Sequence, residues 1–127
     1  MRRRRLFGAG ALMLTVGAGL GVHAFAPDGA TSDIAGDVLY AVAAYLAIVI
    51  VSPRLPTPLA AVIAAAWCTL VELFQLTGVP EVLGAAFWPI MLVLGTVFDA
   101  RDLIVYLVAV ALVALIDGLL RRDSSVR

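Results

Sequence analysis

The sequence has no lysine, one histidine, one cysteine and few charged residues of any kind. Asp, Glu and Arg together make up 14% of its 127 residues, where about 25% is usual in soluble domains. The hydrophobic fraction is 63%, and so small a soluble domain cannot bury that much apolar surface. These shortages exclude a soluble enzyme, a disordered tail and a disulfide scaffold. They predict one integral membrane domain over residues 1–127.

The scarcity of metal-binding and redox residues also limits the chemistry. Cys68 lies inside an apolar run, has no second cysteine to pair with, and is interpreted as a core residue. His23 and the scattered carboxylates make a poor zinc set. No basic stripe with interleaved aromatic residues indicates nucleic-acid binding. We therefore expect no metal, no cofactor and no nucleic-acid partner.

Apolar runs separated by turn-forming residues define the predicted spans. Helices rise about 1.5 Å per residue, so runs of roughly 20 residues cross the hydrocarbon core of a bilayer. Pro89 interrupts the shorter fifth run, residues 82–98, which we interpret as a re-entrant or interfacial helix on the outer side. The predicted fold is an all-α bundle of this helix and four transmembrane helices at residues 6–25, 34–51, 59–79 and 103–120.

The first run has an alternative interpretation as a signal peptide. Arginines 2–5 would supply its basic region, and Ala24, Phe25 and Ala26 resemble a cleavage site. The run is longer than the usual signal core of about 7–15 residues. Pro27 would also follow the cut, where its fixed φ suits an extended protease substrate badly. We favour a retained helix.

The arginine distribution predicts the orientation. With four spans, eight of the nine arginines, including the tail residues Arg121, Arg122 and Arg127, fall on the N-terminal side, and Arg101 alone falls outside. The positive-inside rule then places both termini in the cytoplasm. A five-span alternative would place the three tail arginines outside. We expect a multi-pass protein of the bacterial cytoplasmic membrane.

Polar residues at helical spacing mark a candidate site near the outer ends of three spans. Charged groups within a membrane are costly, so each requires a partner. Small residues on the same helix stripes, such as Ala41, Ala65 and Ala109, would let these helices approach closely. The candidate ligand-binding residues form the pairs Asp37 with Tyr40, Glu72 with Gln75, and Asp102 with Tyr106, and they include Arg101.

Helix capping is the alternative role for two of these acids. Asp37 and Asp102 lie near predicted helix N-termini, where a carboxylate is stabilised without any ligand. Glu72 lies within its span and has no such role, so we expect it to be functional. Gln75 is its expected hydrogen-bonding companion, and Arg101 is the outer cation available to pair with it.

Other features have structural interpretations. Asp117 is expected to pair with Arg121, four residues later. Trp67, Trp88 and Phe87 are interpreted as packing residues or interface anchors. A smooth face for helix packing is predicted on the first helix at Gly10, Gly17 and Gly21.

Three short motifs resemble those of a known family. Residues 36–41 (GDVLYA), 71–76 (VELFQL) and 94–98 (LGTVF), followed by Asp102, resemble a family of small uncharacterised bacterial membrane proteins, itself similar to the VanZ-like proteins. VanZ-like proteins share a membrane-embedded Glu-x-x-Gln and a later Asp, here Glu72, Gln75 and Asp102. VanZ is associated with glycopeptide-antibiotic resistance, so the resemblance implies a role in the cell envelope.

Three functions follow as hypotheses. The first is a non-enzymatic envelope protein whose outward polar pocket binds a lipid or polar headgroup. The second is a small proton-coupled transporter using Glu72, which the absence of an inverted repeat disfavours. The third is an enzyme acting on a lipid-linked substrate, which the absence of a nucleophile with its base disfavours. The bilayer is the expected partner, and a second copy of the chain is a further candidate.

Overall fold

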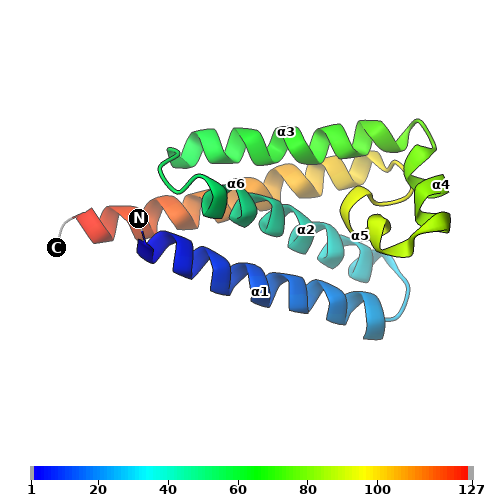
Figure 1. Cartoon of the computed structure of the whole chain (residues 1–127), viewed down its shortest axis with the longest axis horizontal. Coiled ribbons are helices and arrows are strands. Elements are labelled where there is room, and N and C mark those ends of the chain that lie inside the picture. The colour runs from blue at the N-terminus through cyan, green and yellow to red at the C-terminus, as the bar shows by residue number, and fades with distance from the viewer. Residues whose placement is uncertain (1, 126–127) are drawn as a thin grey trace.

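The computed structural model describes residues 2–125, with side chains up to Arg122; Arg127 lies outside this range. Within it, four long helices are joined by short loops and one irregular connection (Figure 1). The long helices are α1 (Arg2–Phe25), α2 (Ala30–Val51), α3 (Thr57–Gln75) and α6 (Ala100–Ser125). The short ones are α4 (Val79–Ala86), the 3-10 turn η1 (Trp88–Ile90) and α5 (Met91–Leu94).

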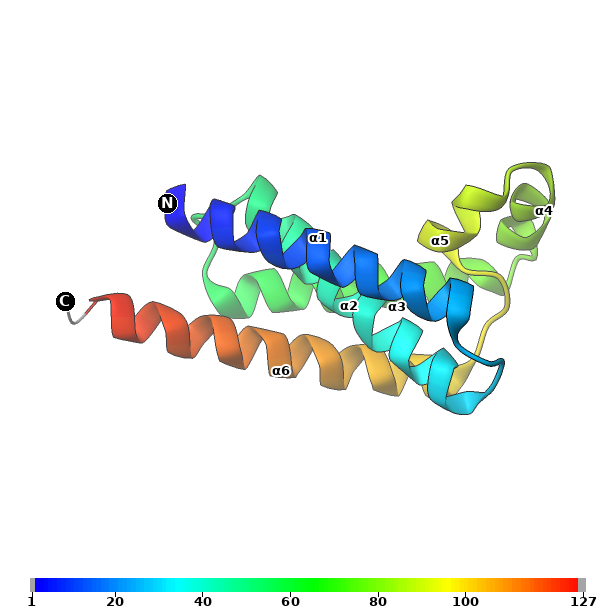
Figure 2. The same ribbon diagram turned by 90° about the horizontal axis from the view of Figure 1, so that it is seen from below.

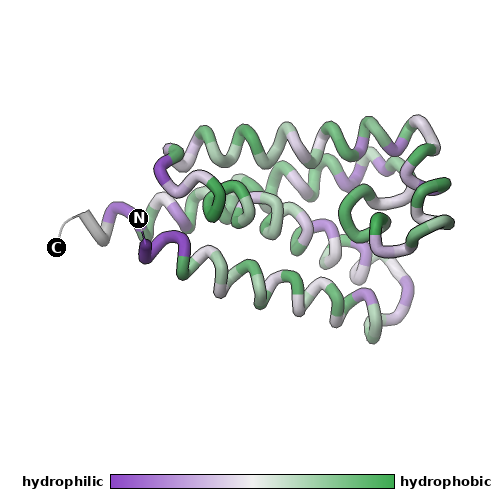
Figure 3. The backbone as a smooth tube through the Cα atoms, in the orientation of Figure 1, coloured by the Kyte–Doolittle hydropathy of each residue, from purple (hydrophilic) through white to green (hydrophobic). Residues whose placement is uncertain are grey.

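The four long helices are each long and apolar enough to cross a membrane. Large apolar side chains cover their outer faces, among them Phe7 and Leu14 of α1, each 78% exposed. Figure 3 shows apolar residues along the helices and hydrophilic ones concentrated near their ends. The expected multi-pass membrane protein is therefore confirmed at the level of four candidate spans.

Different segments of the chain lie at the two ends of the bundle (Figures 1 and 2). Both chain termini and the α2–α3 loop lie at one end, here named the terminal end. The segments α4, η1 and α5 and the start of α6 lie at the other, here named the cap end. Four spans place both termini at the same end, as the predicted topology requires.

The core lies between α2, α3 and α6, which all contact one another. Most of its residues are small, so the helices approach closely, and two tyrosines fill the remaining space. Its fully or almost fully buried members are Ala41, Tyr45, Val49, Ala60, Ala64, Cys68, Tyr106, Ala109, Val110 and Ala114. The predicted burial of Cys68 is confirmed.

Helix α1 packs at the periphery, against α2. The glycine face predicted for this contact is wrong: a Cβ on Gly10, Gly17 or Gly21 would meet no atom within 4 Å. Gly8 makes the contact, and a Cβ there would lie 3.2 Å from Cγ1 of Ile50. The spacing of glycines did not reveal which face of an apolar helix meets its neighbour.

The expected single helix at residues 82–98 is also wrong. Phe87 is extended, with φ −147° and ψ 91°, and it separates α4 from η1. Pro89 lies within η1, and Gly95 ends α5 in the left-handed region, with φ 63°. The chain runs without helix from Gly95 to Asp99. Proline and glycine break the segment into short pieces that fold over the cap end.

Two helix boundaries differ from the expected spans in ways that affect the site. Helix α3 ends at Gln75, and Gly78 in the left-handed region precedes α4. Helix α2 begins at Ala30 and not near residue 34. Asp37 therefore lies two turns inside α2, too far from its N-terminus to act as a cap.

Candidate functional site

Acidic residues from α2, α3 and the start of α6 converge at the cap end of the bundle. Their solvent exposure increases from the inside of the site to its rim: Glu72 is fully buried, and the side chains of Asp33 and Asp99 are 59% and 49% exposed. We name this group the acidic cluster, and it comprises Asp33, Asp37, Glu72, Asp99 and Asp102 with one cation, Arg101. The predicted packing of the helices that carry Asp37, Glu72 and Asp102 is confirmed.

Glu72 forms the deepest part of the acidic cluster. Its Oε1 accepts a hydrogen bond from the Tyr106 hydroxyl at 3.1 Å. Its Oε2 accepts one from the backbone N–H of Asp99 at 3.3 Å. A carboxylate in this position thus ties α3 to the chain just before α6. Both donors come from residues far along the sequence, one of them from main chain, and the spacing of residues around Glu72 did not reveal them.

Tyr106 connects Glu72 to Asp37. Its hydroxyl lies 3.5 Å from Oδ1 of Asp37 as well as 3.1 Å from Glu72. The Tyr106 ring packs on that of Tyr40, with centroids 5.8 Å apart. Because a tyrosine hydroxyl both donates and accepts, it can link two acidic side chains.

Asp37 and Asp102 form an acidic pair beside this tyrosine. Their carboxyl groups are close enough to interact electrostatically. Oδ2 of Asp37 and Oδ1 of Asp102 are buried, and neither receives a hydrogen bond from the described residues. Two carboxylates so close repel unless a proton or a cation lies between them.

Arg101 faces carboxylates other than the one expected. Its guanidinium pairs with Asp102 at 3.5 Å, Asp99 at 3.6 Å and Asp33 at 3.9 Å. Glu72, for which Arg101 was the available outer cation, is not among these partners, because Arg101 lies in the first turn of α6 near the exposed part of the cluster. Asp99 caps this helix, since its Oδ1 accepts from the Arg101 N–H at 2.8 Å.

Gln75 is not the hydrogen-bonding companion of Glu72 that the sequence suggested. Its Nε2 donates to the Leu94 carbonyl at 2.9 Å and so holds the end of α5 against α3. Its side-chain oxygen is buried without a donor among the described residues. A Cβ on Gly95 would collide with this amide, which explains why glycine stands there.

Tyr40 has a different role from that of a cluster ligand. Its hydroxyl donates to the Val93 carbonyl at 2.6 Å and accepts from the Trp67 indole at 3.0 Å. Trp67 was expected to be a packing residue or anchor, and its hydrogen bond was missed. Together these bonds hold α5 across the ends of α2 and α3.

A second polar group lies near the terminal end and was missed. Asp117 forms an ion pair with Arg4 at 2.5 Å and accepts from the Tyr45 and Thr57 hydroxyls at 2.7 and 3.2 Å. The expected pairing of Asp117 with Arg121 is replaced by this group, and Arg121 donates to the Leu55 carbonyl and to Thr57. From the sequence, Arg4 served only to predict the orientation of the chain in the membrane.

The carboxylate oxygens of the acidic cluster suit a ligand that donates hydrogen bonds better than they suit a metal ion. Within residues 2–122, no group of three or more His, Cys, Asp or Glu is placed to hold a metal ion. His23 is exposed and lines a pocket of about 220 Å³ with Asp28 and Asp33. What the cluster offers is a set of acceptor oxygens with a single guanidinium.

Comparison with known families identifies the family of this chain. Residues 26–110 match the family described as protein of unknown function (DUF2809). The chain belongs to the DUF2809 family. The matching region of this DUF2809 protein contains the whole acidic cluster, whereas Arg4 and Asp117 lie outside it. No curated protein and no solved structure matches the chain.

Proposed function

We propose that this DUF2809 protein is a non-enzymatic membrane protein whose acidic cluster binds a cationic, hydrogen-bond-donating headgroup. The observation that carries the proposal is the pair of buried acceptors, Oδ2 of Asp37 and Oδ1 of Asp102, that receive no hydrogen bond from the described residues; Oδ1 of Asp102 has only the ion pair with Arg101, at 3.5 Å. An ammonium group carries three donors and a positive charge. It would satisfy both oxygens and relieve the repulsion between the two carboxylates.

The charge of the cluster supports this ligand class. The cluster contains five carboxyl groups and one guanidinium, so the site attracts cations and repels free anions. Asp33 and Asp99 at the exposed rim would meet a headgroup first, and Asp37 and Asp102 lie deeper. The ends of membrane-spanning helices lie at the depth of lipid headgroups. A phospholipid with a primary amine is therefore the natural probe.

The experiment compares amine and quaternary-ammonium lipids on the purified protein. Native mass spectrometry would measure retention of phosphatidylethanolamine against phosphatidylcholine, whose trimethylated nitrogen donates no hydrogen bonds. We expect preferential retention of phosphatidylethanolamine, and Asp37→Asn should weaken the preference at least several-fold. Asp28→Asn, in the exposed loop before α2, is the matched control and should leave it unchanged. Equal retention of both lipids by the wild type would refute the proposal.

A proton-coupled transporter is the second candidate, because Tyr106 links Asp37 to Glu72 by its hydroxyl. Hydrogen-bonded acids within membranes serve as proton relays. Proteoliposomes loaded with a pH-sensitive dye would test it. This candidate predicts proton movement that Tyr106→Phe slows and the Asp28→Asn control does not.

Localisation and family likeness belong to the same proposal. The arginine asymmetry supports a multi-pass protein of a bacterial cytoplasmic membrane with both termini in the cytoplasm. The Glu-x-x-Gln of Glu72 and Gln75, with the later Asp102, supports a relation to VanZ-like proteins and a role in the cell envelope. On this orientation the acidic cluster faces the outer surface.

A further inference from the structure

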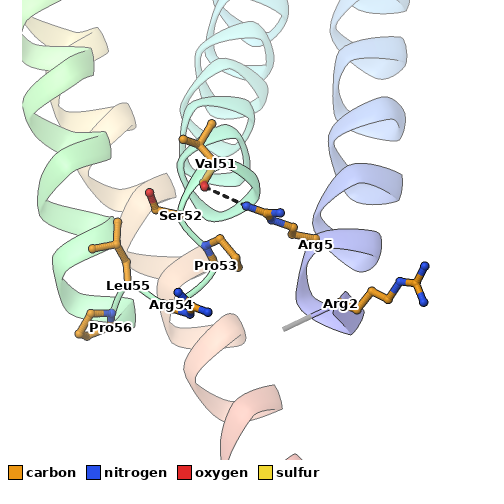
Figure 4. A pocket seen from close by; sticks show the side chains of 8 residues that line it. All are labelled: Arg2, Arg5, Val51, Ser52, Pro53, Arg54, Leu55 and Pro56. Atoms are coloured by element: carbon orange, nitrogen blue, oxygen red, sulfur yellow. Dashed lines mark hydrogen bonds between the residues drawn. The ribbon is translucent and has the colours of Figure 1, made fainter.

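The terminal end of the bundle carries a pocket whose chemistry is opposite to that of the acidic cluster. It measures about 640 Å³ and lies between the start of α1 and the α2–α3 loop (Figure 4). Among the described residues its lining contains three arginines and no carboxylate: Arg2, Arg5, Val51, Ser52, Pro53, Arg54, Leu55 and Pro56. We name it the arginine pocket.

The floor of the arginine pocket is held in one conformation. Arg4 Nη1 donates to the carbonyls of Pro53 at 2.7 Å and Leu55 at 3.0 Å. Leu55 N–H donates to the Ser52 carbonyl at 3.1 Å, closing a turn. Proline at positions 53 and 56 restricts this loop further. A preorganised loop loses little conformational entropy when a ligand binds.

The guanidinium groups present donors around this floor. Arg5 donates to the Ile50 and Val51 carbonyls at 3.0 and 3.3 Å, using two of its five N–H donors. Figure 4 shows Arg5 directed toward the loop, Arg54 under it, and Arg2 extended outward at the rim. Arginine matches the geometry of phosphate oxygens.

We propose that the arginine pocket binds the phosphate of an anionic phospholipid. The pocket lies at the ends of apolar spans, and Leu6, Phe7 and Val51 beside it are 67%, 78% and 75% exposed. Acyl chains can therefore lie against these side chains while the phosphate meets the arginines. The described part of the lining carries three arginines and no carboxylate, so a lipid with net negative charge fits it better than a zwitterionic one.

The test measures lipid retention on the full-length protein by native mass spectrometry, with phosphatidylglycerol and phosphatidylcholine as probes. The wild type should retain phosphatidylglycerol preferentially. Basic residues near a membrane surface contribute about 1 kcal/mol each, so Arg54→Gln should weaken retention about five-fold and Arg2→Gln with Arg54→Gln more. Both residues are exposed, so neither substitution removes a buried side chain.

Arg3→Gln is the matched control, because Arg3 is exposed in the same basic run but does not line the pocket. It should retain phosphatidylglycerol as the wild type does. An equal loss in Arg3→Gln would mean a diffuse basic field and would overturn the site. Displacement of the lipid by millimolar glycerol 3-phosphate would identify a site for free phosphate compounds and would overturn the lipid assignment. Failure with phosphatidylethanolamine at the acidic cluster leaves this result unaffected, since the two sites lie at opposite ends.

Discussion

At the residue scale, Glu72 is the deepest charge in the acidic cluster and can be tested by two substitutions of different chemistry. Glu72→Gln can still accept from the Asp99 N–H and donate to the Tyr106 hydroxyl, which both donates and accepts. Glu72→Leu removes both bonds and leaves the partly buried Asp99 N–H without its acceptor, at about 1–3 kcal/mol, whereas the Tyr106 hydroxyl keeps Asp37 as a partner. We expect Glu72→Gln to fold normally but retain less amine lipid, and Glu72→Leu to unfold at lower temperature.

The measurements are thermal unfolding in detergent and lipid retention by native mass spectrometry. If Glu72→Gln retained phosphatidylethanolamine like the wild type while Glu72→Leu failed to accumulate, Glu72 would be an interhelical hydrogen-bonding residue without a binding role.

Gly95 should tolerate no side chain. Its φ of 63° lies in the left-handed region, and a Cβ would collide with the Gln75 amide that holds α5. Such backbone strain costs on the order of 1–3 kcal/mol, so Gly95→Ala should lower the unfolding temperature. Gly36→Ala is the control, because a Cβ there meets no atom within 4 Å. Equal stability of the two variants would show that the Gln75–Leu94 contact is not formed as described.

Three acids of the cluster and Arg101 were predictable from the sequence, but the places of Asp33 and Asp99 and the hydrogen-bonding partners were not. Helical spacing placed Asp37, Glu72 and Asp102 on inward stripes, because an ionisable group facing lipid is costly. The partners depend on the irregular chain before α6: the Asp99 N–H meets Glu72 and the Leu94 carbonyl meets Gln75. Main-chain donors and acceptors have no signature in side-chain spacing.

At the scale of elements, we expect the ion pair between Arg4 and Asp117 to hold α1 against the rest of the bundle. It packs against α2, and Arg4 reaches across to Asp117 of α6. Asp117→Asn would leave the largely buried Arg4 guanidinium without its anion, at about 1–3 kcal/mol. We expect faster hydrogen exchange in the first turns of α1 while α3 stays protected. Arg3→Gln should leave exchange unchanged, and unaltered exchange in Asp117→Asn would refute this role.

Element boundaries were predictable where proline or charge interrupts an apolar run. The loop at residues 52–56 is such a case, with two prolines and Arg54. The fold of α4, η1 and α5 was not predictable, since its apolar residues continue across breaks at Phe87 and Gly95. Hydrogen bonds from Tyr40 and Gln75 hold these pieces in place, and both bonds join residues far apart in the sequence.

At the scale of the whole molecule, the bundle places both termini at the same end (Figure 1). The basic residues of the terminal end predict that this end is cytoplasmic. Reporter fusions at the N-terminus and after Arg127 should both report a cytoplasmic location. Fusions that report opposite sides would contradict a four-span topology, and two outer locations would invert the orientation.

The two ends of the molecule also carry opposite excess charge: carboxylates at the cap end and arginines at the terminal end. The cap end would then select amine headgroups in one leaflet, and the terminal end would select anionic headgroups in the other. Short-range selection should persist at physiological salt, where screening acts over about 8 Å, because the contacts are direct.

Binding of an amine headgroup at the acidic cluster is tested most directly by a structure of the protein determined in a lipid phase that contains phosphatidylethanolamine. We expect density for a headgroup whose nitrogen lies against the carboxyl groups of Asp37 and Asp102, and we expect Asp37→Asn to lose that density. Direct contact between the two carboxyl groups, with no headgroup density beside them in the wild-type protein, would contradict it.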